Sequence, residues 1–332
     1  MKVVLVSPWA VRCGIYAYTR DLALALSRQG ADVYIVRLNR FGEKSTEYFE
    51  TLASRRMPEA DLIHVQHEYG LYRGGEPAFY GTLRQRQGAT PIVSTMHGVG
   101  LPVPDEVVFD HSDQVIVHNG WCAERYGHPC KVIPHGVEPA TPVEAGEAKD
   151  RLRLDGPVVT VFGFIGPYKG VETAIRTVGM DFPGVNLLMA GGWHVEYETG
   201  YMAQMRALAD AVAPGRVRWT GWVEPDMLPV VFGASDVVLY CNKFATESGA
   251  LLTALGYGRC VLAHGLPPIK EKEETGALQT YTQEGELVLK LERLLEDPAL
   301  RRGYEEAARR YAEEHSWDRV ARLHLDLYEE LV

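Results

Sequence analysis

Short apolar runs alternate with stretches of helical periodicity along the whole chain, and this alternation constrains the fold more than any other feature. Gly, Pro or Asp bound the runs, as is typical of buried parallel strands. In the helical stretch Tyr18–Arg28, one face carries Leu22, Ala25 and Leu26. Strands that alternate with helices predict a doubly wound α/β fold with a mostly parallel sheet. The predicted strands are Val3–Val6, Val33–Val36, Leu62–Val65, Ile92–Ser94, Val115–Val117, Val158–Phe162, Val185–Met189, Val217–Thr220, Val237–Tyr240 and Cys260–Ala263.

A segment rich in proline, alanine and charge, Pro139–Pro157, interrupts this pattern and predicts a linker. The pattern then restarts, which fits the two domains expected for 332 residues. We expect one Rossmann-like domain over residues 1–140 and a second over residues 141–315. Residues 316–332 predict an amphipathic helix with Ser316 as its N-cap. The predicted apolar side of this helix consists of Trp317, Val320, Leu323, Leu327 and Leu331.

The charge of the chain argues against a nucleic-acid partner. The net charge is -10, from 34 basic and 44 acidic residues. The first 150 residues contain 15 basic and 18 acidic residues, and the remainder contains 19 and 26, so the halves carry -3 and -7. Neither half shows the basic excess that is typical of a nucleic-acid binder.

Several features predict a cytoplasmic protein without a metal site. No apolar run approaches the roughly 18 residues that a membrane-spanning helix needs. The apolar N-terminal run ends at Pro8, which is too early for a secretory signal. The five cysteines are scattered and contain no C-x-x-C pair, so we expect reduced thiols and neither a disulfide nor a zinc site. No two aspartates are spaced as D-x-D, a common arrangement for holding a divalent ion.

Glycine and histidine follow three predicted strands of the first half, at the strand ends where open α/β sheets bind their ligands. Gly14 and Ile15 open the predicted helix after the first strand, and a helix N-terminus favours anionic groups. His67 and Glu68 follow the third strand, and His97 follows the fourth in a glycine-rich loop. The alternatives are an ordinary turn glycine and buried, internally satisfied histidines. The G-x-G-x-x-G dinucleotide pattern is absent after the first strand.

Two loops of the second half predict a phosphate-binding site. The first contains Gly163 and ends in Lys169, which precedes a predicted helix over Val171–Val178. A compact cation beside helix amides suits a phosphate, although a solvated surface lysine is the alternative. The second loop leads into a helix through Ser248, Gly249 and Ala250, whose amides suit a diphosphate. Here the alternative is that Ser248 only caps the helix.

The order and spacing of these motifs resemble the retaining glycosyltransferases of the GT-B fold, in particular family 4. The resemblance extends from Cys13 to the helix of Trp317. It implies two Rossmann-like domains that face each other across a cleft, with the C-terminal helix crossing back to the first domain. It also implies transfer of a sugar from a UDP- or GDP-linked donor to an acceptor hydroxyl, with retention of configuration and without a metal or other cofactor. The motifs that carry the resemblance are Gln66–Gly70, Ile133–Val137, Phe162–Gly170 and Ser248–Gly258.

The resemblance also implies a role for each candidate residue. His97, Lys169 and Glu247 are the expected catalytic residues, with His97 touching the transferred sugar. The expected donor-binding residues are Gly14, Gly163, Lys169, Val223, Glu247, Ser248, Gly249 and Ala250. Among them, Lys169 and the amides of Ser248, Gly249 and Ala250 would hold the diphosphate, and Val223 would border the base together with Trp222 and Gly191–Gly192. The expected acceptor-binding residues are Ile15, His67 and Glu68.

The chain departs from the family pattern at two points. Phe164 stands where members commonly have an arginine, and Ala245 and Thr253 stand where they often have a pair of glutamates. One alternative is therefore a sugar-nucleotide 2-epimerase, for which Glu68 and Glu247 are the evident acid and base candidates. Another is a non-catalytic member that binds a nucleotide or a glycan.

The expected partners are a nucleotide-sugar donor and a glycan or small-molecule acceptor. Many members of the family use lipid acceptors, which makes membrane association conceivable for this chain. The first half contains no basic excess and no evident basic amphipathic helix, and this argues against such an association.

Overall fold

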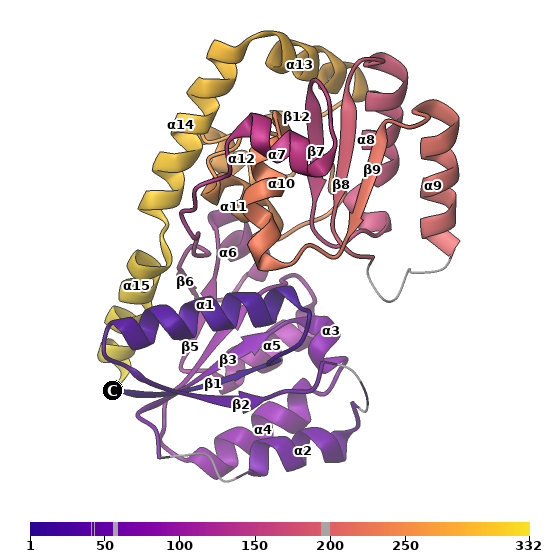
Figure 1. Ribbon diagram of the computed structural model, residues 1–332. Helices are drawn as coiled ribbons and strands as arrows, with labels where there is room; N and C mark the ends of the chain where they lie inside the picture. Colours follow the sequence, from indigo (N-terminus) through magenta and orange to yellow (C-terminus); the bar gives the residue numbers. More distant parts are fainter. Residues whose placement is uncertain (41, 43, 56–58, 194–199) are drawn as a thin grey trace. The chain divides into compact units, whose positions relative to one another are not determined.

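A computed structural model describes residues 1–40, 42, 44–55, 59–193 and 200–332. The chain divides into two compact units, shown with their elements in Figure 1. The first unit contains Met1–Gly136 together with His315–Val332, and the second contains Val137–Glu314. The boundary predicted from the sequence, at residue 140, lies a few residues after this division. Each unit contains one parallel sheet between helices, which confirms the predicted α/β class.

The sheet of the first unit has the order β2-β1-β3-β4-β5-β6, with parallel pairing throughout. The strand order reverses at β1, so the loops after β1 and β3 leave the sheet at a topological switch point. Ligands bind at such points in open α/β sheets. The strands are β1 (Lys2–Ser7), β2 (Asp32–Arg37), β3 (Leu62–His67), β4 (Ile92–Met96), β5 (Gln114–Val117) and β6 (Lys131–Val132).

Helices cover both faces of this sheet, as a buried parallel sheet requires. One core joins α1 and α15 to the face that carries Val3 and Leu5. A second core joins α2, α4 and α5 to the face that carries Val4 and Val6. The helices are α1 (Gly14–Arg28), α2 (Thr46–Ser54), α3 (Tyr69–Tyr72), α4 (Glu76–Gln87), α5 (Pro102–His111), α6 (Gly120–Tyr126) and α15 (Trp317–Leu331).

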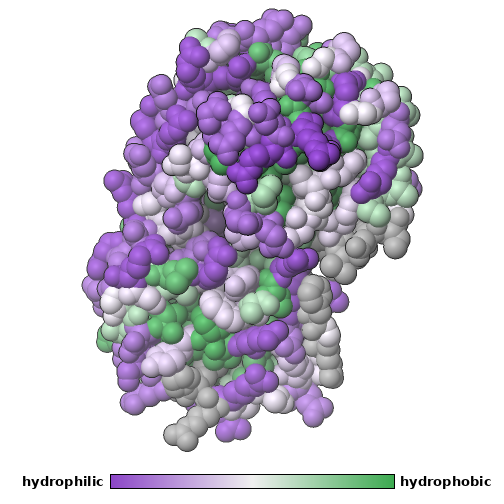
Figure 2. All heavy atoms as spheres, in the orientation of Figure 1, coloured by the Kyte–Doolittle hydropathy of each residue, from purple (hydrophilic) through white to green (hydrophobic). Residues whose placement is uncertain are grey.

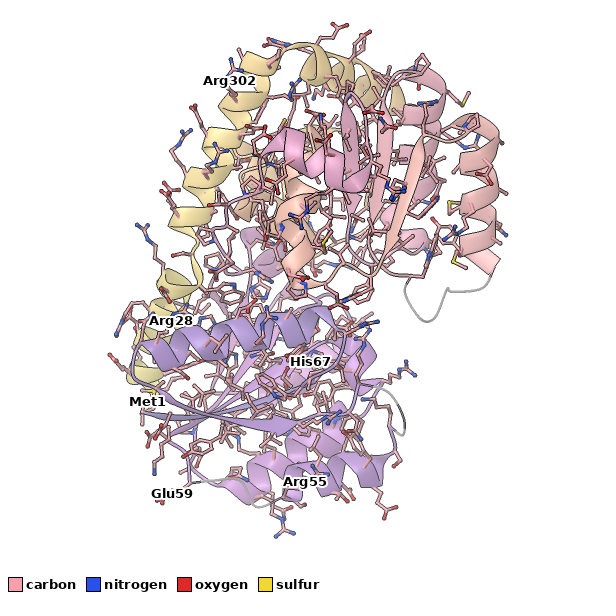
Figure 3. All side chains as sticks on the ribbon, viewed as in Figure 1. Met1, Arg28, Arg55, Glu59, His67 and Arg302 are labelled. Atoms are coloured by element: carbon pink, nitrogen blue, oxygen red, sulfur yellow. The ribbon has the colours of Figure 1, made fainter. Side chains whose placement is uncertain are left out.

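The C-terminal helix α15 packs beside α1. At the end of α1, Arg28 donates from Nη2 to Asp318 over 2.6 Å, and Figure 3 shows Arg28 next to α15. The predicted apolar side of α15 is wrong at Leu323, which is 45% exposed. The buried side of the helix contains His324 and Tyr328 instead, both completely covered. This terminal helix therefore brings polar groups into the core of the first unit.

The sheet of the second unit has the order β12-β11-β10-β7-β8-β9, and its switch point lies between β7 and β10. Its strands are β7 (Val158–Phe162), β8 (Asn186–Ala190), β9 (Val217–Gly221), β10 (Val237–Tyr240), β11 (Val261–His264) and β12 (Gln279–Tyr281). The helices are α7 (Ala145–Leu152), η1 (Pro167–Lys169), α8 (Val171–Arg176), η2 (Thr177–Asp181), α9 (Gly200–Val212), η4 (Pro225–Met227), α10 (Leu228–Ala234), α11 (Gly249–Gly256), α12 (Pro267–Glu274), α13 (Glu284–Glu296) and α14 (Pro298–Glu314).

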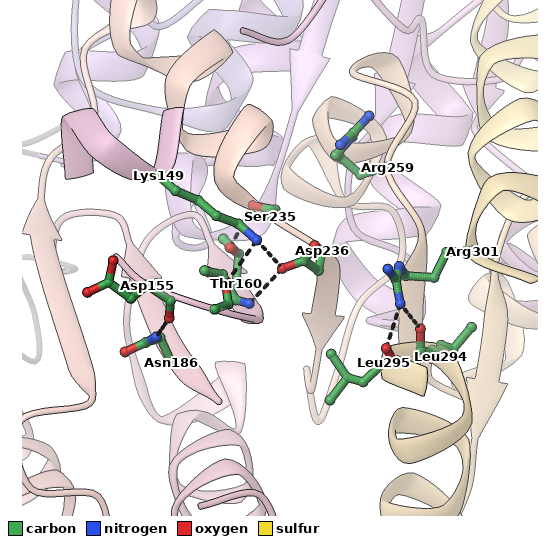
Figure 4. Close-up of polar contacts among 12 residues, drawn as sticks. Lys149, Asp155, Thr160, Asn186, Ser235, Asp236, Arg259, Leu294, Leu295 and Arg301 are labelled. Atoms are coloured by element: carbon green, nitrogen blue, oxygen red, sulfur yellow. Dashed lines mark hydrogen bonds and ion pairs between the residues drawn. The ribbon is translucent and has the colours of Figure 1, made fainter. Parts of the chain in front are cut away.

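The predicted linker Pro139–Pro157 is wrong as a loop, because it contains α7 and belongs to the second unit. Lys149 of this helix donates to Asp236 Oδ2 over 2.7 Å. The same carboxylate oxygen accepts the backbone N–H of Val158 at 2.8 Å (Figure 4). One aspartate thus joins α7, the start of β7 and the start of β10. The predicted helix Val171–Val178 is also longer than expected, since α8 continues through the π-helical turn η2 to Asp181.

The two units show different surfaces in the view of Figure 2. Hydrophilic residues cover much of the second unit, whereas apolar residues gather around α1 and β2 of the first. Leu24 of α1 and Tyr34 of β2 are among the exposed large hydrophobic residues. Within the described residues, no helix combines the length and the apolar character needed to cross a membrane.

Candidate active site

Lys169 is a buried cation at the end of η1, in the loop that follows β7. Only 5% of its surface is exposed. Its amino group lies 3.5 Å from the carbonyl oxygen of Phe162 and 5.3 Å from the centre of the Tyr240 ring. Among the described residues, none supplies a carboxylate within ion-pair distance of Nζ. Burial lowers the pKa of Lys169 to about 8, because removing the ammonium from water disfavours its charge. This position suits an anionic ligand that would restore the lost solvation.

Gly163, Lys169 and the start of α11 lie together. A Cβ atom on Gly163 would be 3.0 Å from Cβ of Ala250 and 3.2 Å from Nζ of Lys169. Gly163 also has a φ of +107°, a conformation that other residues rarely adopt. The N–H groups of Gly249 and Ala250 are in the first turn of α11, where no intrahelical acceptor exists. A buried ammonium and two open amides therefore lie close together, as a diphosphate site requires.

Ser248 caps α11 as predicted, because its hydroxyl accepts the N–H of Leu251 at 3.3 Å. Its own N–H donates to Oε1 of Glu247 over 2.8 Å. The Ser248 amide, unlike those of Gly249 and Ala250, is thus already engaged in this structure. The diphosphate contact expected of it would require Glu247 to release that hydrogen.

Glu247 forms a buried ion pair that the sequence analysis did not anticipate. Its Oε2 accepts from Lys272 Nζ of α12 at 2.8 Å, and the two side chains are 7% and 5% exposed. Since each carboxylate oxygen already accepts a hydrogen bond, Glu247 holds the loop before α11 in position. A donor sugar could reach only its remaining lone pairs.

An aromatic surface lies at the ends of β7 and β9. The rings of Phe164 and Trp222 are 5.4 Å apart, and Trp222 is 37% exposed. Gly192 leaves room beside the indole, since a Cβ there would lie 3.5 Å from Trp222. Val223, at the next position, is partly buried and packs against the core. An exposed ring of this kind offers a stacking face to a planar base.

In the first unit, β1 ends at Ser7 and α1 begins at Gly14, beside the switch point. Gly14 is exposed, and a Cβ added to it would meet nothing within 4 Å. Ile15 is partly buried and packs against the core. No neighbouring atom therefore requires a glycine at position 14. The missing side chain leaves open space beside the first residue of α1.

His67 is completely buried, as Figure 3 indicates for its position inside the first unit. Its Nε2 lies 3.2 Å from Oε1 of Glu76, and its ring stacks on Tyr72 with centroids 4.9 Å apart. The expected direct contact between His67 and an acceptor is therefore not available here, because no part of the ring reaches solvent. Glu68 is partly exposed at the start of α3, and its Oε2 would lie 2.9 Å from a Cβ on Gly70.

His97 belongs to a cluster of rings, and it is the one member that the sequence predicted as a site residue. It is partly exposed after β4, and its Nδ1 lies 3.4 Å from Nε2 of His118. The ring of Tyr18 packs against His97, His118 and His135, with centroids 4.7, 5.2 and 4.9 Å away. Burial and then the neighbouring histidines hold the pKa of His97 well below its usual range. Trp317 of α15 completes the cluster at 5.2 Å from Tyr18.

Comparison with known proteins identifies the family. The model of the family "Glycosyl transferases group 1" matches residues 144–311, just over half of the chain. The chain belongs to this family. The match covers Lys169, Glu247 and α11, so the loops of the second unit described above lie inside the region that the family model matches, whereas those of the first unit lie outside it.

Two curated relatives and two solved structures extend this finding. The chain is 30% identical over 207 residues to 2-deoxystreptamine glucosyltransferase of Streptomyces kanamyceticus, which aligns over 56% of this chain and 51% of the relative. It is 27% identical over 307 residues to D-inositol 3-phosphate glycosyltransferase of Acidothermus cellulolyticus, over 81% of this chain and 66% of the relative. The chain thus spans about half of the first relative's length and about two thirds of the second's.

The fold is similar to that of sucrose-phosphate synthase from Thermosynechococcus elongatus, with a TM-score of 0.83 at 20% identity over 100% of this chain and 99% of the other. It is also similar to HepE of Anabaena in complex with UDP-glucose, with a TM-score of 0.80 at 18% identity over 99% and 100% of the two chains. These likenesses confirm the predicted GT-B fold. Retention and membership of family 4 stay predictions.

Two departures from the family pattern have visible consequences. Phe164, which stands in place of the usual arginine, packs on Trp222. The cation that lies beside Gly163 is Lys169. Thr253, in place of a glutamate, donates its hydroxyl to the carbonyl of Gly249 over 2.7 Å within α11. Within the described residues, no cluster of His, Cys, Asp and Glu could hold a metal ion.

A pocket of about 530 Å³ lies elsewhere in the second unit, lined by Pro139–Ala145, Gly256 and Arg259 among others. Gly256 ends α11, whereas Gly249 begins it. The pocket is therefore at the opposite end of α11 from the amides beside Lys169, and it contains none of the predicted site residues.

Proposed function

We propose that this group 1 family member transfers a sugar from a UDP- or GDP-linked donor to an acceptor hydroxyl with retention of configuration. One observation carries the proposal: the buried ammonium of Lys169 has no carboxylate partner among the described residues and lies near the open amides at the start of α11. A buried cation without a counter-ion is costly, and a bound diphosphate offsets that cost.

The nucleotide-sugar donor has support from similar proteins. The names of both relatives describe sugar transfer, and one of them is a glucosyltransferase. The similar HepE structures contain UDP, and one of them contains UDP-glucose. We assign the base to the Trp222 surface, beside Gly192 and Val223. The acceptor, a glycan or a small molecule, we assign to the first unit near Ile15 and Glu68.

In this proposal, catalysis is electrostatic and needs neither a metal nor another cofactor. As the bond between the sugar and the diphosphate breaks, negative charge develops on the leaving phosphate. Lys169 and the N–H groups of Gly249 and Ala250 stabilise that charge. These groups are held in position before the reaction, so little reorganisation is needed as the charge develops. His97 contacts the transferred sugar, and Glu247 positions the loop that presents the amides.

Incubation with labelled UDP- and GDP-sugars tests the proposal. Free nucleotide together with a glycosylated product supports it. Epimerised donor would instead identify a 2-epimerase, and binding without chemical change would identify a non-catalytic member. The buried pairing of Glu247 with Lys272 disfavours the epimerase, because an acid-base carboxylate must reach the sugar.

A thermal-shift screen finds the donor before any acceptor is known. A ligand at 100 times its Kd stabilises the folded protein by about 2.7 kcal/mol. The shift should appear with one nucleotide series and be lost in Lys169→Met. A shift that persists in the variant would separate Lys169 from the donor site.

A further inference from the structure

The pocket at the C-terminal end of α11 has one wall that backbone hydrogen bonds hold in place. This wall is the segment Pro139–Ala145. The N–H of Ala140 donates to the carbonyl oxygen of Gly256 over 2.9 Å, and the N–H of Val143 donates to that of Pro229 over 2.9 Å. Every residue that lines the pocket belongs to the second unit, so the pocket lies within that unit.

Two glycines let the same segment lie close to the rest of the unit. A Cβ atom on Gly233 would be 2.4 Å from the carbonyl oxygen of Val143, and one on Gly256 would be 2.4 Å from that of Glu138. A larger residue at either position would displace the backbone, so only glycine permits this close approach. The volume of about 530 Å³ is therefore enclosed by fixed backbone, and its size suits a small organic ligand.

Arg259, which lies just before β11 (Figure 4), lines this pocket with a guanidinium group that makes few contacts. Its side chain is 12% exposed. Its Nε lies 3.3 Å from the carbonyl oxygen of Tyr257, and its Nη1 lies 3.9 Å from Oε1 of Glu305. Within the part of the chain that the structure describes, it forms no other hydrogen bond or ion pair. A guanidinium has five N–H donors, so both N–H groups of Nη2 are left for an acceptor in the pocket.

A second guanidinium, that of Arg309 on α14, also lines the pocket. A Cβ atom on Gly258 would be 2.6 Å from Cγ and 2.7 Å from Nε of Arg309, so this side chain lies on the backbone next to Arg259. Burial lowers the pKa of Arg259, Glu305 opposes this change, and the positive charge of Arg309 adds to it. An anion that contacts both arginines would relieve the repulsion between them.

The acidic side chains nearby do not form close ion pairs with these arginines. Glu144 caps α7, where its Oε2 accepts the N–H of Glu147 at 3.1 Å. Glu313 is exposed and forms no ion pair with Arg309, one turn earlier in α14. Of the carboxylates that the structure describes, none lies closer to either guanidinium than the 3.9 Å of Glu305. The two arginines therefore present positive charge to the pocket.

We propose that this pocket binds a small organic molecule through a phosphate monoester, whose oxygens contact Arg259 and Arg309. The planar fork of a guanidinium matches the oxygens of a phosphate, and such charge-assisted contacts are strong. A phosphate dianion balances two positive charges, whereas a single carboxylate balances one. The rest of the volume accommodates the organic group. The site is separate from the proposed diphosphate site at the other end of α11, and its existence does not depend on sugar transfer.

Isothermal titration calorimetry of the full chain with inorganic phosphate tests the site. The titrations use the variant Lys169→Met, so that the proposed diphosphate site does not contribute, and potassium chloride at equal ionic strength is the blank. We expect saturable binding with a Kd on the order of 1 mM. Adding Arg259→Met should weaken it by about tenfold or more, because charge-assisted hydrogen bonds are lost. Unchanged affinity in that variant would overturn the proposal.

Arg310→Met is the matched control, because Arg310 follows Arg309 in α14 but is exposed and does not line the pocket. It should bind phosphate within about twofold of the Lys169→Met background. An equal loss in Arg310→Met and Arg259→Met would assign the effect to general surface charge and overturn the proposal. If Arg259→Met does not fold, Arg309→Met replaces it, since substitution of an exposed side chain usually has little effect on stability.

Two further probes define the ligand class. Glycerol 3-phosphate, a simple phosphate monoester, should bind at least as tightly as inorganic phosphate, because the pocket has room for its organic part. Acetate should bind more weakly than phosphate, and equal affinities would overturn the choice of a dianion. Weaker binding of glycerol 3-phosphate than of inorganic phosphate would overturn the monoester. Since none of these titrations requires turnover, they decide on the site even if the protein transfers no sugar from any donor.

Discussion

Lys169 in the second unit and His97 in the first both follow the carboxyl end of a central strand, yet their surroundings are opposite in kind. Lys169 is a buried cation whose ammonium lies 3.5 Å from the carbonyl oxygen of Phe162. His97 belongs to a chain in which each buried polar group contacts the next. Burial lowers the pKa of both side chains, which favours neutral His97 but leaves Lys169 without the solvation its charge needs.

Lys169 needs a bound ligand to compensate its charge, whereas contacts within the protein already hold His97 in position. Removing an unpaired buried charge should cost little stability, whereas removing one member of a satisfied network leaves its partner without a hydrogen bond. A substitution of Lys169 should therefore reduce activity with little loss of stability, whereas a substitution in the network around His97 should reduce stability as well.

The largest effect is expected for Lys169→Met. Loss of the ammonium removes stabilisation of the leaving diphosphate and should reduce kcat by about 10²- to 10³-fold. The melting temperature should stay the same or rise, because an uncompensated buried charge has been replaced by an apolar chain of similar length. Steady-state kinetics and calorimetry measure the two quantities. A large loss of stability would mean that Lys169 supports the fold, and near-normal turnover would remove it from the donor site.

Acid should act first on the first unit. Burial lowers the pKa of His64, His97 and His324, the last to about 4, whereas the unfolded chain binds protons near the ordinary pKa of 6.5. The unfolded state then holds more protons below pH 6.5, so stability falls as the pH decreases. Between pH 6.5 and 5, each such histidine removes up to about 2 kcal/mol from the free energy of unfolding.

Urea unfolding at a series of pH values measures this loss, with His324→Leu as the comparison. The variant should lose less stability between pH 6.5 and 5, because one titrating group is gone. Most carboxylates titrate below about pH 4.5 and add little in this window. Equal losses in the two proteins would contradict the assignment of His324 as a neutral buried group.

Alkali should act on the second unit through Lys169. Its pKa of about 8 means that the ammonium loses its proton as the pH rises above that value. Binding of UDP should weaken by about tenfold between pH 7 and 9, because at pH 9, one unit above this pKa, only about a tenth of the free protein carries the charged Lys169. Isothermal titration calorimetry measures the affinity. Lys169→Arg stays charged throughout and should bind UDP with little pH dependence, and the same alkaline weakening in that variant would assign the effect to another group.

Much of the fold could be predicted because buried parallel strands leave apolar runs in the sequence. Every predicted strand is present, whereas β6 and β12 were missed because they are short and partly polar. The helix α7 was missed for a related reason, since its charged and alanine-rich sequence resembles a linker. Its position depends on Asp236, which lies 87 residues beyond Lys149 and gives no local signal.

The candidate site was predictable where its signal is local. The glycine at 163, the lysine at 169 and the start of α11 lie in short strand-to-helix loops, and the structure brings them together. The contacts of His64 with Tyr328 and of Glu247 with Lys272 join residues 264 and 25 positions apart. No spacing rule in a single sequence identifies such pairs, so the burial of Glu247 and the chain behind His97 required the structure.

The smallest effect is expected for Gly14→Ala in the first unit. A Cβ at this position meets nothing within 4 Å, and alanine favours a helix, so the free energy of unfolding should change by less than about 1 kcal/mol. If the open space beside α1 accommodates the donor, the added methyl group displaces it slightly and reduces turnover by about fivefold. Gly81→Ala, another helical glycine with nothing within 4 Å, is the matched control in α4 and should leave turnover unchanged. Equal turnover in both variants would show that the first unit does not approach the donor through Gly14, which would leave the second unit as the principal holder of the diphosphate.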